Sequence, residues 1–156
     1  MKGNISIYMC YKENSVFLKE ENRDGYIVSA LMKKVWAVEL DLLSELDRVC
    51  KKYNIKYYAA FGTLLGAVRN KGFIPWDDDI DVCMLRDDYA KFKEVAKNEF
   101  GGKYYYQDWY NSCGRTWIFS KLRNSETTAI EYPEKPKEFN QGIFIDIFHN
   151  NRKNLI

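Results

Sequence analysis

The sequence predicts an α/β or α+β domain with a mostly central sheet, of which we favour α+β, with a mixed sheet flanked by helices. Two observations indicate this class. Apolar residues recur at helical spacing over one long early segment, and short apolar runs of strand character alternate with helical segments farther along the chain. The 156 residues suffice for one domain with a hydrophobic core. Hydrophobic residues make up 46% and charged residues 29%, a balance typical of globular proteins.

The first helix is expected between residues 27 and 53. Charged residues, Glu39 among them, lie mostly off its apolar stripe. The stripe recurs at intervals of three and four residues and comprises Leu31, Val35, Val38, Leu42, Leu46 and Val49. Residues 1–26 are polar with a turn-rich end, and we assign this segment no role. The domain proper is therefore expected to span residues 27–156.

Shorter elements follow the helix. Asn54 ends it, and a buried strand is expected over 55–61, broken by Gly62 and Thr63. A short helix over 64–69 comes next, then a strand over 79–85 and a helix over 89–98 capped by Asp87 and Asp88. The remaining strands are expected over 103–109, 116–123 and 142–148.

Composition excludes several classes of protein. A net charge of +2 is unlike the strongly basic face of a nucleic-acid binder. Four dispersed cysteines and one histidine provide no zinc-ligand cluster and indicate reduced, cytoplasmic thiols. No apolar run reaches the ~20 residues of a membrane span, so we expect a cytoplasmic protein, with peripheral attachment to the inner membrane face left open.

The motif PWDDDIDVC, residues 75–83, gathers four carboxylates within five positions beside apolar residues. On a strand, Asp79 and Asp81 would share one face while Ile80 and Val82 face the core. Carboxylates this close repel unless a cation neutralises them, and Mg²⁺ prefers oxygen ligands. A magnesium site is the favoured interpretation. A solvated acidic turn is the structural alternative.

Asp146 is a third candidate ligand, since it stands alone in the apolar run 143–148. A carboxylate in such a run is costly to bury unless it is paired or bound to a cation. Beside the strand of Asp79 and Asp81, it would complete a three-carboxylate site. The alternative is an ion pair with Lys121 or Arg123.

Gly62 and Thr63 lie where a strand passes into a helix, a place where backbone N–H groups and the helix dipole favour an anion such as phosphate. Alone, such a turn is most often an ordinary connection. Followed by a spaced acidic pair and a third acid on a later strand, it resembles the nucleotidyltransferase fold shared by polymerase-beta-like enzymes.

The run FGTLLGAVRNKGFIPWDDDIDVCMLRDDYAKF, residues 61–92, is similar to the signature of the LicD family, phosphocholine transferases of bacterial surface glycans related distantly to fukutin and fukutin-related protein. The resemblance extends over residues 35–148. It implies Mg²⁺-dependent transfer of a phospho-alcohol such as phosphocholine from a CDP-linked donor such as CDP-choline. The implied acceptor is a hydroxyl of a glycan or glycolipid, as in lipopolysaccharide or teichoic acid, and CMP is released.

The resemblance also implies roles for residues. Gly62 and Thr63 would hold the donor's phosphate, and Asp79, Asp81 and Asp146 would ligate the metal. Asp146 would be the first candidate to accept the proton of the acceptor hydroxyl.

Four basic residues and one aromatic residue complete the implied site. Arg69, Lys71, Lys121 and Arg123 are candidates for neutralising the diphosphate, with solvated surface positions as the alternative. Trp76 is a candidate for stacking on cytosine or enclosing an ammonium group, with core packing as the alternative.

Two other functions stay open at this point. A nucleotidyltransferase would move NMP from an NTP and release pyrophosphate. A non-catalytic nucleotide-binding fragment would bind donor without turnover. This function stays open because the polar stretch 150–156 does not resemble the family's continuation, and we expect the domain to be incomplete at its C-terminus.

Overall fold

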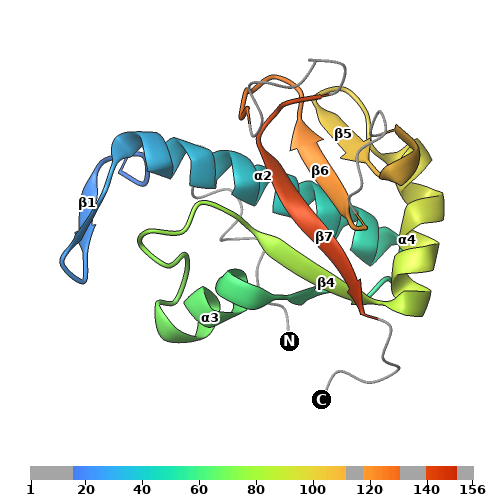
Figure 1. Cartoon of the computed structure of the whole chain (residues 1–156), viewed down its shortest axis with the longest axis horizontal. Helices are drawn as coiled ribbons and strands as arrows, with labels where there is room; N and C mark the ends of the chain where they lie inside the picture. The colour runs from blue at the N-terminus through green and yellow to red at the C-terminus, as the bar shows by residue number, and fades with distance from the viewer. Residues whose placement is uncertain (1–15, 112–117, 131–139, 151–156) are drawn as a thin grey trace.

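The computed structural model describes residues 16–111, 118–130 and 140–150, and shows a mixed sheet with helices packed against it (Figure 1). The sheet has five strands in the order β3-β4-β7-β6-β5. Strands β4 and β7 are parallel, and the other neighbouring pairs are antiparallel. The predicted α+β class, a mixed sheet flanked by helices, is confirmed.

The long helix α2 spans Ala30–Tyr53 and begins three residues later than predicted. The Ser29 side chain caps it by accepting a hydrogen bond from the Met32 N–H at 3.1 Å. Residues 27 and 28 belong to a hairpin instead, in which β1 (Glu21–Arg23) pairs with β2 (Tyr26–Val28). The helical spacing of the apolar residues was misleading there, because backbone pairing across the turn fixes these residues as a strand.

Leu31 departs from the predicted buried stripe. It is 73% exposed, since it lies in the first turn of α2, where the helix projects beyond the sheet (Figure 1). Leu42, Leu46 and Val49, farther along the same stripe, are fully buried.

The expected strand over 55–61 is reduced to β3, Tyr58–Ala59. Helix α3 spans Phe61–Arg69, so Gly62 and Thr63 form its first turn instead of a break before it. β4 covers Asp81–Leu85, two residues shorter than predicted. Asp77, Asp78 and Asp79 consequently lie in the preceding loop and do not alternate as strand residues would.

Helix α4 spans Arg86–Glu99, and its N-cap residue Leu85 makes no side-chain cap. The predicted caps Asp87 and Asp88 are therefore wrong. Both lie inside the first turn, where the Asp88 carboxylate accepts a hydrogen bond from the Lys56 N–H at 3.2 Å.

The remaining elements are β5 (Tyr104–Gln107), a 3₁₀ turn (Trp109–Asn111), β6 (Ser120–Asn124) and β7 (Phe144–Asn150). β6 begins later than the predicted 116, and residues 116 and 117 lie outside the described residues. β7 begins two residues later than predicted and runs two residues farther.

One face of the sheet packs against α2 and α4. Alternate strand residues point toward these helices, as the pleat requires. The strand residues in this core are Val82, Met84, Tyr106, Leu122, Ile145 and Ile147. The residues between them, Asp81 and Asp146 among them, face the other side. Among the described residues, no helix is long and apolar enough to cross a membrane.

Candidate active site

The parallel strands β4 and β7 bring two of the predicted acids together. Asp81 and Asp146 are direct register partners, and the Asp146 N–H donates to the Ile80 carbonyl at 2.9 Å. Both side chains face away from the α2 core. The side chain of Asp146 is 13% exposed, and Asp81 is 8% exposed. The structure thus places Asp146 next to the acidic motif.

The acidic loop before β4 is fixed by α2. The fully buried Trp36 donates its Nε1–H to the Asp77 carbonyl at 2.9 Å, and its ring stacks on Phe73 with centroids 4.5 Å apart. These two contacts attach the loop to α2.

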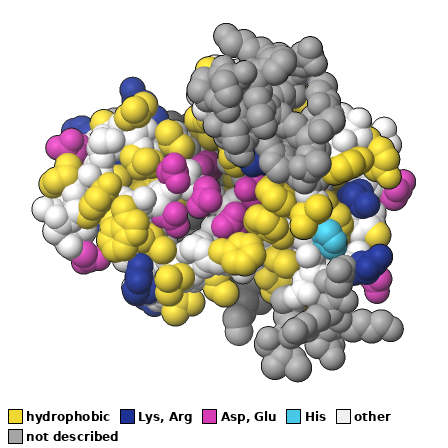
Figure 2. Space-filling model, in the orientation of Figure 1, with side chains coloured by type: hydrophobic (Ala, Val, Ile, Leu, Met, Phe, Trp, Pro, Cys, Tyr) yellow, Lys and Arg dark blue, Asp and Glu magenta, His cyan; other side chains and the backbone are white. Residues whose placement is uncertain are grey.

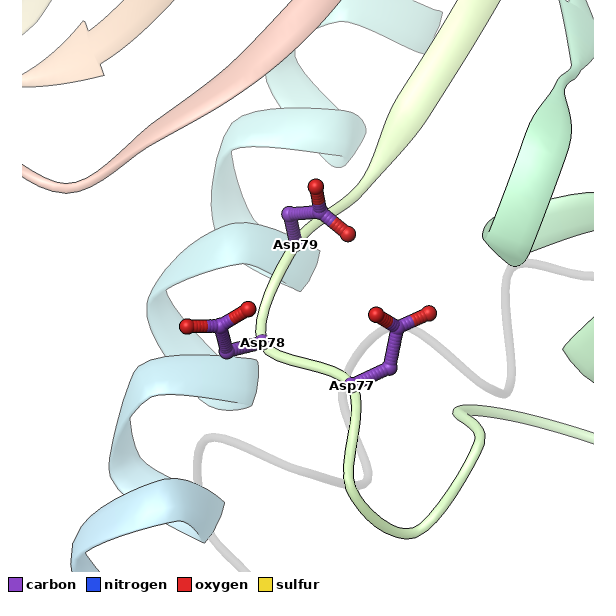
Figure 3. A group of neighbouring side chains, drawn as sticks. All are labelled: Asp77, Asp78 and Asp79. Atoms are coloured by element: carbon purple, nitrogen blue, oxygen red, sulfur yellow. The ribbon is translucent and has the colours of Figure 1, made fainter.

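Asp77, Asp78 and Asp79 present carboxylate oxygens within 4.8 Å of one another (Figure 3). Among the described residues, no other group of three possible metal ligands lies this close together. The set shares only Asp79 with the predicted ligands Asp79, Asp81 and Asp146. In Figure 3 Asp78 points toward α2, whereas Asp77 and Asp79 point to the other side of the loop. These three residues, together with Asp81 and Asp146 on the adjacent strands β4 and β7, are called the carboxylate group below.

Two of these acids hold protons more strongly than ordinary aspartates. Burial, followed by the charges of Asp77, Asp78 and Asp146, raises the pKa of Asp79 to about 6. Burial, followed by the charges of Asp79, Asp146 and Asp77, raises the pKa of Asp81 to about 7, while Lys121 opposes the shift. A divalent cation would relieve this repulsion, so the oxygen donors present fit Mg²⁺.

Lys121 lies against Asp146. Its Nζ is 2.9 Å from Asp146 Oδ1, and its side chain is 3% exposed. The alternative expected for Asp146, an ion pair with Lys121, is therefore present. A buried ammonium beside the acids also provides a positive charge at the edge of the site.

Gly62 and Thr63 contact the acidic segment from the first turn of α3. The Asp81 N–H donates to Thr63 Oγ1 at 2.8 Å, which leaves the Thr63 hydroxyl hydrogen available to another acceptor. A Cβ on Gly62 would lie 2.5 Å from Asp77 Oδ2. The carboxylate of Asp77 thus occupies the space beside the N-terminal turn of α3 in which a phosphate was expected.

The other predicted binding residues differ in whether they are exposed to a ligand. Arg123 is fully buried and donates from Nη1 to the Gly142 carbonyl at 2.9 Å, with Nε bound to Gln107 at 2.5 Å. Arg69 and Lys71 are exposed, and the Arg69 guanidinium lies 5.9 Å from the centroid of the Trp76 ring. Trp76 is 60% exposed, so core packing, the alternative considered for this ring, is wrong. Arg69 and Trp76 are available to a ligand at the surface, whereas the contacts of Arg123 are internal.

Sequence reasoning missed Glu39. This residue of α2 is 2% exposed, and its Oε2 has no hydrogen-bond partner among the described residues. Burial, followed by the charges of Asp79, Asp78, Asp77 and Asp81, raises the pKa of Glu39 to about 10. Its position could have been found, because it lies four residues after Val35 and three before Leu42, on the buried stripe.

The family described as "LicD/FKTN/FKRP, nucleotidyltransferase domain" matches residues 54–154. The chain belongs to this family. It is also 54% identical over 56 residues to the lipopolysaccharide cholinephosphotransferase LicD of Haemophilus influenzae, a match covering 36% of this chain and 21% of that protein.

Uncharacterised Rickettsia proteins show longer matches to this LicD-family chain. The protein from Rickettsia prowazekii is 34% identical over 119 residues, covering 75% of this chain and 44% of that protein. The protein from Rickettsia typhi is 33% identical over 104 residues, covering 63% of this chain and 33% of that protein. The matches span less than half the length of these curated relatives. No solved structure matches the chain.

Proposed function

We propose that this LicD-family chain is a Mg²⁺-dependent phosphotransferase. It moves a phospho-alcohol such as phosphocholine from a CDP-linked donor to a hydroxyl of a cell-surface glycan or its precursor. Two observations support this most: the acidic set Asp77–Asp79 in the loop before β4, and the register pairing of Asp81 on β4 with Asp146 on β7. Relatedness to a cholinephosphotransferase supports the choice of transferred group.

In the proposed reaction the acceptor oxygen forms a bond to the phosphorus of the phospho-alcohol, and the bond from that phosphorus to the CMP oxygen breaks. The acceptor's proton passes to a carboxylate, with Asp146 as first candidate because it lies beside Asp81 on the neighbouring strand. Bound Mg²⁺ supplies charge neutralisation of the diphosphate and of the leaving phosphate.

The chain's own residues orient the donor in this proposal. Asp79, Asp81 and Asp146 hold the metal, as first expected, and the acidic set adds Asp77 and Asp78 as further oxygen donors. Thr63 donates its hydroxyl hydrogen to a phosphate oxygen, and Lys121 offsets negative charge next to Asp146.

The test is nucleotide product analysis. The chain is incubated with CDP-choline, Mg²⁺ and a lipopolysaccharide or teichoic-acid acceptor, and nucleotides are separated chromatographically. We expect wild type to release CMP. The rate of CMP release should be at least about 100-fold lower in Asp79→Asn/Asp81→Asn, because that pair holds the metal in the proposal. Pyrophosphate release from CTP would indicate NMP transfer instead. Tight donor binding without CMP release would indicate a non-catalytic nucleotide-binding fragment.

A further inference from the structure

A cavity of about 460 Å³ lies between α2, the acidic loop and the start of β7. On the α2 side it adjoins the carboxylate group of the candidate active site, with which it shares Asp78 and Asp79. Its described lining residues are Met32, Val35, Glu39, Asp78, Asp79, Thr128, Ala129, Ile130, Ile143 and Phe144. Figure 2 shows acidic side chains gathered on one face of the molecule among hydrophobic ones.

The ionisable residues that line this cavity in the described part of the chain are all acidic. Glu39, Asp78 and Asp79 are acidic, and none of the described lining residues is Lys, Arg or His. Only 2% of Glu39 is exposed to solvent, and within the described part of the chain its Oε2 has no hydrogen-bond partner. A buried polar atom without a partner is costly, so it indicates a ligand that satisfies it. The cavity therefore fits a cation.

The rest of the wall indicates which kind of cation. Met32, Val35, Ile130 and Ile143 present apolar surface. A hydrated metal ion prefers oxygen on all sides, whereas an alkylammonium group combines positive charge with carbon surface. The ring of Phe144 already lies 3.4 Å from Lys121 Nζ, so the carboxylates, and not this ring, provide the attraction.

We propose that the cavity binds the ammonium head of the transferred alcohol, with Glu39 and Asp78 facing the charge and the apolar wall contacting its methyl groups. This inference rests on the proposed function and adds the determinant of its substrate class. Asp79 connects the two parts of the site, because it lines the cavity and belongs to the carboxylate group that would hold the metal. The phosphate would lie on one side of the acidic loop and the ammonium group on the other.

The test compares two donors that share CDP and differ in the head group. Calorimetric titration with Mg²⁺ measures Kd for CDP-choline and for CDP-glycerol, whose alcohol is uncharged. We expect wild type to prefer CDP-choline. Glu39→Gln keeps the side-chain volume and removes the carboxyl group that a bound ammonium group would stabilise in its ionised form, so it should reduce that preference about ten-fold by weakening CDP-choline binding alone. Asp78→Asn, at an exposed residue, should also reduce the preference, and it should in addition weaken Mg²⁺-dependent binding of both donors, because Asp78 belongs to the acidic set.

Asp41→Asn is the matched control. Asp41 is on the same helix and 4% exposed, but its Oδ2 is 2.7 Å from Lys103 Nζ and 3.1 Å from the Tyr104 hydroxyl, so the preference should not change.

Equal binding of both donors by wild type, or equal weakening of both in Glu39→Gln, overturns the inference and leaves the proposed function standing. A titration with Mn²⁺ alone gives the number of Mn²⁺ ions bound per chain. If Glu39→Gln binds one ion fewer than wild type, the cavity is a metal site instead of an ammonium site. Binding of neither donor by folded wild type defeats the proposed function, and this inference with it.

Discussion

At the scale of single residues, Gly62 sets the distance between α3 and the acidic loop. The Asp77 carboxylate approaches the first turn of α3 so closely that a Cβ at position 62 would lie 2.5 Å from Oδ2. A carboxylate in that position is stabilised by the positive end of the helix dipole. The glycine is required here for close approach, a need that the sequence motif alone does not reveal.

Gly62→Ala should displace the Asp77 carboxylate and weaken divalent-cation binding about ten-fold, because a ligand set held by fixed side chains loses affinity when one of them moves. Calorimetry with Mn²⁺ measures this affinity. Gly101→Ala is the control, since a Cβ there meets no atom within 4 Å. Equal Mn²⁺ affinity in the two variants would show that Asp77 is not part of the metal site.

Glu39 illustrates a conflict between stability and function. Its carboxyl group is buried beside three aspartates with one oxygen unpaired among the described residues. Glu39→Met should therefore raise the free energy of unfolding by about 1–3 kcal/mol, because the unsatisfied group is removed and the volume is kept. Urea denaturation measures the change. A destabilised variant would show that Glu39 has a structural role instead.

At the scale of elements, α2 supports the site as well as the core. Its second half carries Leu42, Leu46 and Val49 into the core, whereas its first half holds Trp36 against the acidic loop and Glu39 against the cavity. The helix thus connects the folding of the sheet to the conformation of the loop that carries the candidate ligands.

Trp36→Phe should weaken Mn²⁺ binding, because it keeps an aromatic ring against Phe73 but removes the donor to the Asp77 carbonyl. We also expect a loss of about 1–3 kcal/mol in the free energy of unfolding. Leu46→Ala, at a fully buried residue of the same helix, should cost about 2–5 kcal/mol while leaving Mn²⁺ affinity unchanged in the folded protein. Mn²⁺ binding by Trp36→Phe as strong as that of wild type would show that Trp36 does not position the loop.

At the scale of the whole molecule, the carboxylate group makes stability depend on pH. The pKa values of Asp79, Asp81 and Glu39 are raised to about 6, 7 and 10, so the folded chain holds more protons than the unfolded chain between about pH 5 and pH 7. The free energy of unfolding should therefore fall as pH rises through this window when no metal is present.

Chemical denaturation at pH 5 and pH 7.5, with and without Mg²⁺, measures this dependence. Mg²⁺ should restore stability at pH 7.5, because it binds the ionised carboxylates of the folded chain. Asp79→Asn/Asp81→Asn should reduce the pH dependence, leaving the contribution of Glu39, and should remove the effect of Mg²⁺. A metal-free wild type whose stability increases between these pH values would contradict the electrostatic description of the site.

Much of this architecture follows from local sequence patterns. The apolar and acidic residues around Asp81 and Asp146 predicted strands with their acids on one face, and the structure pairs these two residues directly. The start of α2 was misplaced because Ile27 and Val28 fit helical spacing equally well, and only pairing with 21–23 decides between strand and helix. Patterns of this kind identify an element more reliably than its ends.

Contacts between distant segments account for the rest. The burial of Arg123 depends on Gln107 and Gly142, which come from other parts of the chain. The distance from Gly62 to Asp77 depends on how the loop folds back onto α3. Neither could be predicted from spacing, whereas the place of Glu39 on the buried stripe of α2 could have been.

In the proposed function, the carboxylates of β4, β7 and the preceding loop bind a CDP-linked donor through Mg²⁺. Calorimetric titration of CDP-choline into the purified chain, with Mg²⁺ and with EDTA, tests it most directly. We predict binding that requires Mg²⁺ and is lost in Asp79→Asn/Asp81→Asn. Binding of equal strength in EDTA, or retained in the double variant, would contradict the claim.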